Sequence, residues 1–142
     1  MDQYTTPARL TTTGSVLQSL IAQLRRIKPV YDQLRFVASY SSPNLAGRFV
    51  SAIQDMSGQH PTDLRIQVGQ FALGTSPYLW LVNRHTLATD NLDLNVTLNL
   101  PAGQTFAVTD VFTGSILARV SQSNSSFRLL LGPGSGKLLA LR

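Results

Sequence analysis

The spacing of apolar residues changes once along the chain, near residue 48. Before that point, one stripe of apolar residues recurs at helical spacing in an otherwise polar segment: Val16, Leu17, Leu20, Ile21, Leu24 and Ile27. Such a stripe is typical of an amphipathic helix whose apolar face packs on another element. Pro29 interrupts the pattern, and Val30, Leu34 and Val37 predict one or two further helical turns. We therefore expect the N-terminal third to be helical.

After residue 48 the apolar residues recur at every second position, which is the period of a half-buried strand. The most regular stretch is 92–100, where five Leu or Val residues alternate with polar ones. Residues 64–84 predict a hairpin around a turn at 74–77, and Thr113-Gly114 predicts another tight turn. About eight short strands at regular spacing predict a mainly β fold, an antiparallel two-sheet β-sandwich. We expect residues 1–45 to form a lead-in and a helix that packs on the sandwich, and residues 46–142 to form the sandwich itself.

Composition excludes several classes of function. The chain has 142 residues, enough for one domain with its own core. It has no Cys, which rules out disulfides, thiolate catalysis and Cys-ligated zinc. The net charge of +5 comes from ten Arg and two Lys against seven Asp, with no Glu. Apart from Arg25, Arg26 and Lys28 the basic residues are scattered, so we expect no nucleic-acid partner.

The chain shows no targeting or membrane signal. Residues 1–13 have no apolar core of the kind a signal peptide needs. No run approaches the roughly 18 apolar residues of a membrane-spanning helix. We therefore expect a soluble chain with no membrane partner, which leaves open whether a parent protein is secreted or cytoplasmic.

Two sequence features resemble ligand sites without meeting their requirements. Residues 132–137, GPGSGK, resemble a phosphate-binding loop, but no Ser or Thr follows Lys137 and no room remains for a helix. We interpret this segment as a hairpin turn. His60 and His85 both fall in predicted loops, and we interpret them as solvent-exposed side chains rather than metal ligands. The sequence thus predicts no metal and no other cofactor.

The seven Asp residues do not form a recognisable catalytic pair. Asp90 and Asp93 lie in or beside a loop, and Asp110 lies among apolar residues near a turn. We expect Asp110 to accept backbone N–H hydrogen bonds there. No Gly-x-Ser-x-Gly segment is present to expose a nucleophilic Ser. We therefore predict no catalytic residue and no enzymatic activity of the chain itself.

Aromatic residues offer one alternative function. Tyr78, Trp80 and Tyr40, together with Tyr31, would stack on sugar rings if their faces were exposed. However, Tyr78 and Trp80 share a strand face with Val82, a spacing that is also typical of buried positions. The position of the Trp80 ring decides between carbohydrate binding and a structural role.

Four segments occur in an order that resembles a known family: QVGQF (67–71), YLWLVNR (78–84), VTDVFTG (108–114) and FRLLLGPGSGKLLAL (127–141). Together they resemble the small C-terminal β-sandwich that follows the (β/α)8 catalytic barrel of many glycoside hydrolases. Residues 24–30 are similar to the segment that links such a barrel to its sandwich. The resemblance covers residues 15–142.

This resemblance implies an accessory role. In such enzymes both catalytic carboxylates belong to the barrel, so no catalytic residue is carried over to this chain. The resemblance implies a non-catalytic accessory domain of a glycoside hydrolase-like protein, as a fragment or a free-standing relative. Its partner would be a glycosidase catalytic domain or a carbohydrate. Two alternatives stay open: a carbohydrate-binding module that uses surface aromatics, and an interaction domain that forms homo-oligomers through an exposed sheet edge or the N-terminal helix.

Overall fold

The computed structural model describes residues 25, 28, 30 and 32–142. The expected helix at 16–27 and the candidate residue Tyr31 therefore lie outside the described residues, Arg25 excepted. In the described part the chain forms nine strands: β1 (Arg35–Ser41), β2 (Val50–Asp55), β3 (Ile66–Leu73), β4 (Ser76–Asn83), β5 (Leu92–Leu98), β6 (Thr105–Asp110), β7 (Ile116–Ser121), β8 (Ser126–Leu131) and β9 (Gly136–Leu141).

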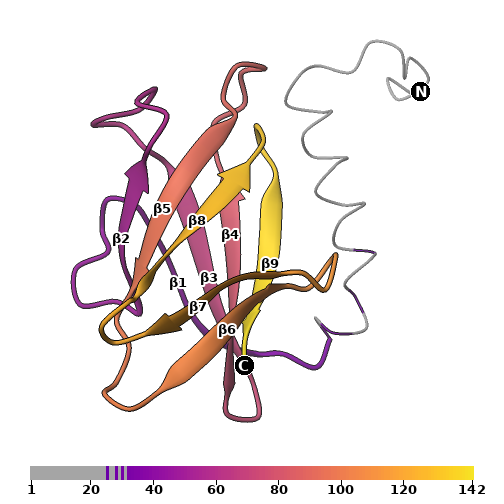
Figure 1. Ribbon diagram of the computed structural model, residues 1–142. Coiled ribbons are helices and arrows are strands. Elements are labelled where there is room, and N and C mark those ends of the chain that lie inside the picture. The colour runs from indigo at the N-terminus through magenta and orange to yellow at the C-terminus, as the bar shows by residue number, and fades with distance from the viewer. Residues whose placement is uncertain (1–24, 26–27, 29, 31) are drawn as a thin grey trace, which may run out of the picture.

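The strands form two antiparallel sheets that lie face to face (Figure 1). One sheet has six strands in the order β1-β3-β4-β9-β6-β7, and the other has three in the order β2-β5-β8. Every strand pair is antiparallel. The prediction of a mainly β, two-sheet antiparallel fold is therefore confirmed.

The core lies between the two sheets and follows from the alternating sequence pattern. In β5, Leu92, Leu94, Val96 and Leu98 are all at most 2% exposed, while the residues between them are only partly buried. Leu79 and Leu81 of β4 are fully buried in the same core from the opposite sheet. A period of two places alternate side chains on opposite faces of a strand, so the apolar set of each sheet points inward.

The central hairpin is formed as predicted. β3 and β4 pair from Ile66↔Asn83 to Leu73↔Ser76, so that the turn itself is Gly74-Thr75. Gly74 has a φ of 61°, a value that favours glycine in a two-residue hairpin turn. β4 also pairs with β9 on its other edge, which places this hairpin in the interior of the six-stranded sheet.

Two expectations about local structure are wrong. Residues 35–41 form strand β1 and not helical turns, so the sandwich begins before residue 46. Phe36, Val37 and Tyr40 favour strand, and pairing with β3 overrides the helical spacing of the preceding apolar residues. The segment 132–135 is not a hairpin turn, because β8 pairs with β5 and β9 pairs with β4 and β6. It is a turn that carries the chain from one sheet to the other.

Three of the four outermost strands pair irregularly with their neighbours. The register of β1 on β3 shifts between Phe36 and Ala38, and that of β2 on β5 shifts between Val50 and Ala52. The β6–β7 pair shifts between Val108 and Thr109. Only the outermost strand β8 pairs with its neighbour β5 in unbroken register. Such bulges bend a strand and increase its twist.

Candidate functional site

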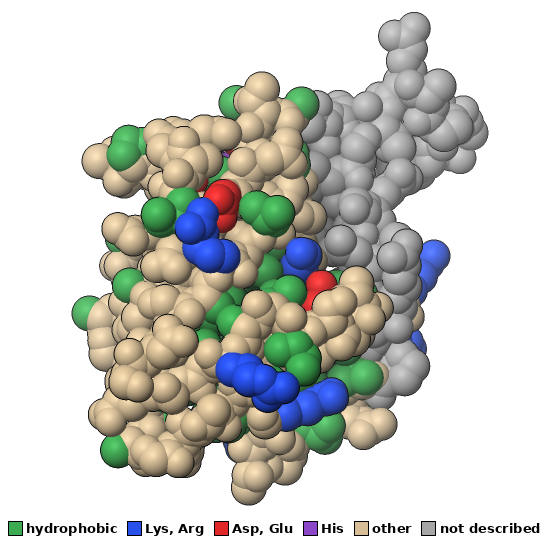
Figure 2. Space-filling model, in the orientation of Figure 1, with side chains coloured by type: hydrophobic (Ala, Val, Ile, Leu, Met, Phe, Trp, Pro, Cys, Tyr) green, Lys and Arg blue, Asp and Glu red, His purple; other side chains and the backbone are tan. Residues whose placement is uncertain are grey.

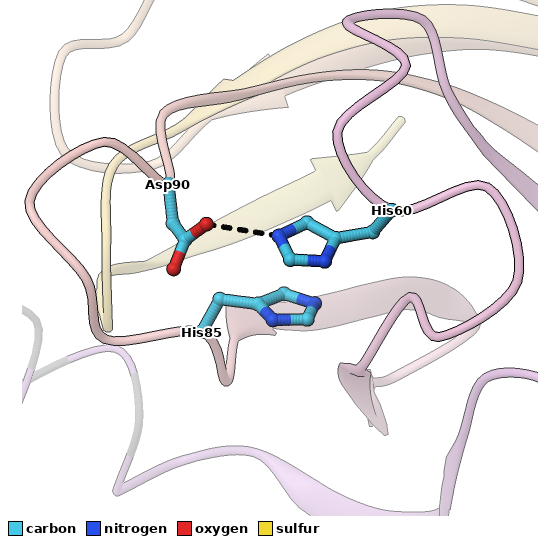
Figure 3. Close-up of side chains that lie close together, drawn as sticks. All are labelled: His60, His85 and Asp90. Atoms are coloured by element: carbon cyan, nitrogen blue, oxygen red, sulfur yellow. Dashed lines mark hydrogen bonds and ion pairs between the residues drawn. The ribbon is translucent and has the colours of Figure 1, made fainter.

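The most distinctive group of polar side chains lies where the β2–β3 loop (56–65) meets the β4–β5 loop (84–91). His60 comes from the first loop, and His85 and Asp90 come from the second (Figure 3). We call these three residues the His60 cluster. His60 Nε2 lies 2.9 Å from Asp90 Oδ1. The two imidazole rings stack with their centroids 3.6 Å apart and an interplanar angle of 16°.

Backbone hydrogen bonds at the end of β4 hold His85 and Asp90 in place. Asn83, which is fully buried, accepts the His85 N–H at Oδ1 (2.9 Å) and donates from Nδ2 to the Asp90 carbonyl (2.9 Å). Asp90 Oδ2 accepts the Leu87 N–H at 3.0 Å. The Gly134 N–H donates to the His85 carbonyl at 2.8 Å. The inter-sheet turn therefore also supports the β4–β5 loop.

His60 is positioned by carboxylates on three sides. Its backbone N–H donates to Asp55 Oδ2 (2.8 Å) at the end of β2. Its ring nitrogens Nδ1 and Nε2 face Asp63 Oδ1 (3.1 Å) and Asp90 Oδ1 (2.9 Å) respectively. The Asp90 side chain is 6% exposed, whereas that of Asp63 is 67% exposed. One imidazole ring thus joins a buried carboxylate to a solvated one.

The two histidines of the His60 cluster have pKa values shifted in opposite directions. The hydrogen bond with Asp90, reinforced by Asp63, raises the pKa of His60. The same bond lowers the pKa of Asp90. Burial lowers the pKa of His85, and the nearby charge of His60 lowers it further. These shifts favour an imidazolium at His60 stacked on a neutral imidazole at His85.

Asp55 belongs to the same electrostatic group. Burial raises its pKa, but hydrogen bonds from Ser57 and the His60 N–H outweigh this and lower it overall. Its carboxylate therefore stays charged while it orders the start of the β2–β3 loop.

The His60 cluster does not fit a metal ion, although its ligand atoms lie within 4.8 Å of one another. His85 Nε2 accepts the Arg65 N–H at 3.0 Å, so the proton of the neutral ring belongs on Nδ1 and neither nitrogen has a free lone pair. A metal-bound histidine instead donates its other ring N–H to an acceptor. In addition, the in-plane lone pairs of two nearly parallel stacked rings do not converge on one point.

The same pairing limits proton transfer by His60. A general base needs an imidazole nitrogen with a free lone pair near the substrate. Both ring nitrogens of His60 face carboxylates, and the cation has no lone pair to offer. The arrangement is therefore suited to fastening two loops together.

The interpretation of both histidines as solvent-exposed loop side chains is wrong, because His85 is buried and His60 is largely buried. Both residues do lie in loops, but His85 is 2% exposed and the His60 side chain is 15% exposed. His60 and His85 are distant in sequence, and only the adjacency of the two loops brings them together. No spacing motif in the sequence marks this cluster.

The aromatic residues proposed for carbohydrate binding do not form a common exposed surface. Tyr40 is 7% exposed and its hydroxyl accepts the Val50 N–H at 3.0 Å, which connects the two sheets. Burial raises the pKa of this hydroxyl. Tyr78 is 3% exposed. Trp80 is half-buried, with its ring at 6.3 Å and 61° from that of Phe112.

Tyr78 and Trp80 instead belong to a second apolar cluster on the outer face of the six-stranded sheet. Its buried members are Tyr78, Leu138 and Ala140, and the partly buried residues packed against them include Trp80, Val30 and Leu34. The segment before β1 therefore covers part of this face. We use the term second apolar cluster for this group below.

Comparisons with known proteins identify no relative of the chain. No protein-family model, curated protein or solved structure matches the chain. Within the described residues, no helix has the length and apolar character to cross a membrane. Function must therefore be argued from the residues themselves.

The visible surface carries few charges. Figure 2 shows a face on which basic and acidic side chains form small groups separated by wide uncharged areas. This sparse distribution of charge agrees with the composition, in which only 13% of residues are charged, about half the usual share.

Proposed function

We propose that the chain is a non-catalytic accessory β-sandwich domain of a glycoside hydrolase-like protein, whose partner is a glycosidase catalytic barrel. The observation that carries this proposal is that the residues of the four resembling segments build the sandwich. Their roles are to place strands, turns and aromatic rings. Motifs with that role are expected of a structural domain rather than of a catalytic one.

Two glycines of these segments accommodate aromatic rings on the outer sheet face. A Cβ at Gly69 would lie 3.0 Å from Phe71 Cε1 and 3.5 Å from Trp80 Cβ. A Cβ at Gly136 would lie 3.1 Å from Trp80 Cζ2 and 3.2 Å from the Leu81 carbonyl oxygen. Both strands need glycine because an aromatic ring lies against them.

Two polar residues of these segments fasten turns. Asn83 donates to the carbonyls of Asp90 (2.9 Å) and Gly132 (3.0 Å), and so joins the ends of β4 and β8. Asp110 Oδ1 accepts the Phe112 N–H at 2.9 Å in the β6–β7 turn. The prediction that Asp110 accepts a backbone hydrogen bond is confirmed.

Carbohydrate binding is less well supported than a structural role. Binding modules that stack on sugars present ring faces to solvent, whereas Tyr40 and Tyr78 are buried. Trp80 is partly covered by the second apolar cluster. Among the three aromatic candidates, a sugar site would therefore depend on Trp80.

Fluorescence of the isolated chain tests the accessory proposal against the binding module, because Trp80 is the single Trp. We expect blue-shifted emission that does not change on titration with a panel of soluble polysaccharides and oligosaccharides. Saturable quenching by one glycan would instead establish a binding module and identify its ligand.

A second experiment tests the absence of catalysis. We expect no turnover of a panel of aryl glycosides by the repurified chain. Turnover that persists through repurification and disappears in an Asp substitution would overturn the proposal. Sedimentation of the same sample addresses the other alternative, since concentration-dependent oligomers would favour an interaction domain.

A further inference from the structure

We infer that protonated His60 is a pH-dependent fastener that joins the β2–β3 loop to the β4–β5 loop at one end of the sandwich. The inference is independent of the accessory role proposed above. It rests on the number of hydrogen-bond donors that the His60 ring must supply.

Two carboxylates face the His60 ring, one at each nitrogen: Asp63 Oδ1 at Nδ1 (3.1 Å) and Asp90 Oδ1 at Nε2 (2.9 Å). An ionised carboxylate only accepts hydrogen bonds, so each needs an N–H opposite it. A neutral imidazole has one N–H, and its other nitrogen would direct a lone pair at a carboxylate. Only the imidazolium satisfies both carboxylates.

The remaining charged groups around the ring are consistent with a cation at His60. Asp55 accepts the His60 backbone N–H and adds a third negative charge nearby. His85 stacks on the ring, and because its Nε2 accepts the Arg65 N–H it remains neutral. Arg65 opposes protonation of His85. The charged groups in contact with His60 itself are therefore carboxylates.

Loss of the His60 proton would weaken the contact between the loops. The β2–β3 loop is joined to the β4–β5 loop by the His60–Asp90 hydrogen bond (2.9 Å) and, next to the strands, by the bonds from the Arg65 N–H to His85 Nε2 and from the Arg84 N–H to the Arg65 carbonyl (3.0 Å each). Of these bonds, the His60–Asp90 bond is the one that carries the charge of His60. Both loops expose apolar side chains, Met56 at 49% and Leu87 at 67%. Above the pKa of His60 we expect these loops to separate more often, so the shape of this end of the molecule depends on pH.

The test is a pH titration of the full chain by NMR, from pH 5.5 to 9. With two histidines in the sequence, the two imidazole signals can be assigned with single variants. We expect the His60 signal to titrate above about pH 6.5, the usual histidine value, and the His85 signal below it. A His60 midpoint at or below that value would overturn the inference.

Amide hydrogen exchange then tests the mechanical consequence. The Leu87 N–H, which donates to Asp90 Oδ2, reports on the loops, and the Phe112 N–H, which donates to Asp110 Oδ1, serves as a reference. We expect the Leu87 protection factor to fall roughly three- to tenfold across the His60 titration, the scale of one ordinary hydrogen bond, because the neutral ring still has one N–H. The Phe112 protection factor should remain constant. Equal changes at both amides, or none at Leu87, would contradict the fastener.

Two variants complete the design. His60→Gln retains an amide donor that does not titrate, so the pH dependence of Leu87 protection should disappear. Asp63→Asn alters an exposed side chain and removes one of the two carboxylates that face the ring, so the titration midpoint of His60 should fall. This second variant tests the inference even if His60→Gln does not fold. A pH dependence that persists unchanged in His60→Gln, or a His60 midpoint unmoved in Asp63→Asn, would each overturn the inference.

Discussion

Strand β4 takes part in two clusters that are stabilised in different ways. On its outer face, Tyr78 and Trp80 belong to the second apolar cluster, which depends on removing apolar surface from water. At its C-terminal end, Asn83 supports the His60 cluster, which depends on hydrogen bonds and charge. The first kind of stabilisation is insensitive to pH, and the second is not. One strand thus connects a cluster whose stability does not depend on pH to a cluster whose stability does.

The largest expected effect is in the apolar cluster. Leu138 is fully buried in this cluster and pairs with Trp80 across β4 and β9, so Leu138→Ala should lower the free energy of unfolding by about 2–5 kcal/mol. The loss should be the same at pH 6 and pH 8, measured by urea denaturation. Leu130→Ala is the matched control, because Leu130 is 67% exposed and should change stability by no more than about 0.5 kcal/mol. A loss that differs between the two pH values would contradict the expectation that the second apolar cluster is insensitive to pH.

The next largest effect concerns Asn83, which supports the His60 cluster. Asn83→Ala leaves the Asp90 carbonyl and the His85 N–H without the Asn83 side chain as their partner, whereas the Gly132 carbonyl still accepts from the Ser135 N–H and hydroxyl. We expect a loss of about 2–3 kcal/mol in the free energy of unfolding, since unsatisfied buried polar groups are costly. The exposed Asn99 provides the control variant, Asn99→Ala. If both variants were equally stable, the network at the end of β4 would have little energetic importance.

A smaller loss of stability is expected when a methyl group is added at Gly136, next to the Trp80 ring. In Gly136→Ala the new methyl group would meet Val82 Cγ2 at 3.0 Å and the Leu81 carbonyl at 3.2 Å. Because backbone cannot move aside as a flexible side chain does, we expect a cost of about 1–2 kcal/mol and a shift in Trp80 emission. Gly132→Ala is the control, since its nearest contacts would lie at 3.5 Å. An unchanged emission in Gly136→Ala would place the indole elsewhere.

The smallest effect is the pH dependence of stability, and its direction differs for the two histidines. The raised pKa of His60 gives stability that is present below about pH 6.5 and is lost as the pH rises through the folded-state pKa. The lowered pKa of His85 destabilises the fold increasingly below about pH 6.5. Asp90, with its lowered pKa, adds a loss below about pH 4.

Unfolding free energies should therefore reach a maximum near pH 6.5, with a modest decline on the alkaline side, as histidine pKa values in unfolded chains indicate. The amplitude should be about 1 kcal/mol, the typical net contribution of one hydrogen bond to stability. Urea denaturation between pH 5 and pH 9 measures it, with His60→Gln as the control that should be flat above pH 6.5. Stability that rises continuously toward pH 9 would contradict the assignment of an imidazolium at His60.

Most of the fold could be predicted from the sequence because alternation is a local property. The regular alternation of residues 92–98 became β5, and the turn at Gly74 became the β3–β4 hairpin. β1 was missed because Val30, Leu34 and Val37 fit a helical spacing as well. Its strand conformation is decided by pairing with β3, which is not a local property.

The candidate site could not be predicted for the same reason. His60 and Asp90 belong to different loops, and their contact requires that β2 and β4 end at the same end of the sandwich. The burial of His85 likewise depends on the inter-sheet turn whose Gly134 N–H binds its carbonyl. Sequence reasoning did identify Asp110 correctly, because its partner Phe112 is only two residues away.

The irregular pairing of the outer strands also bears on how the protein behaves when concentrated. A strand whose register is interrupted is a poor template for a second sheet, because an incoming strand cannot pair along its whole length. β1, β2 and β7 all belong to pairs with such a shift, whereas β8 pairs regularly and exposes Leu130. If the chain forms aggregates at high concentration, β8 is the strand from which we expect them to grow, and a Lys in place of Leu130 should delay them.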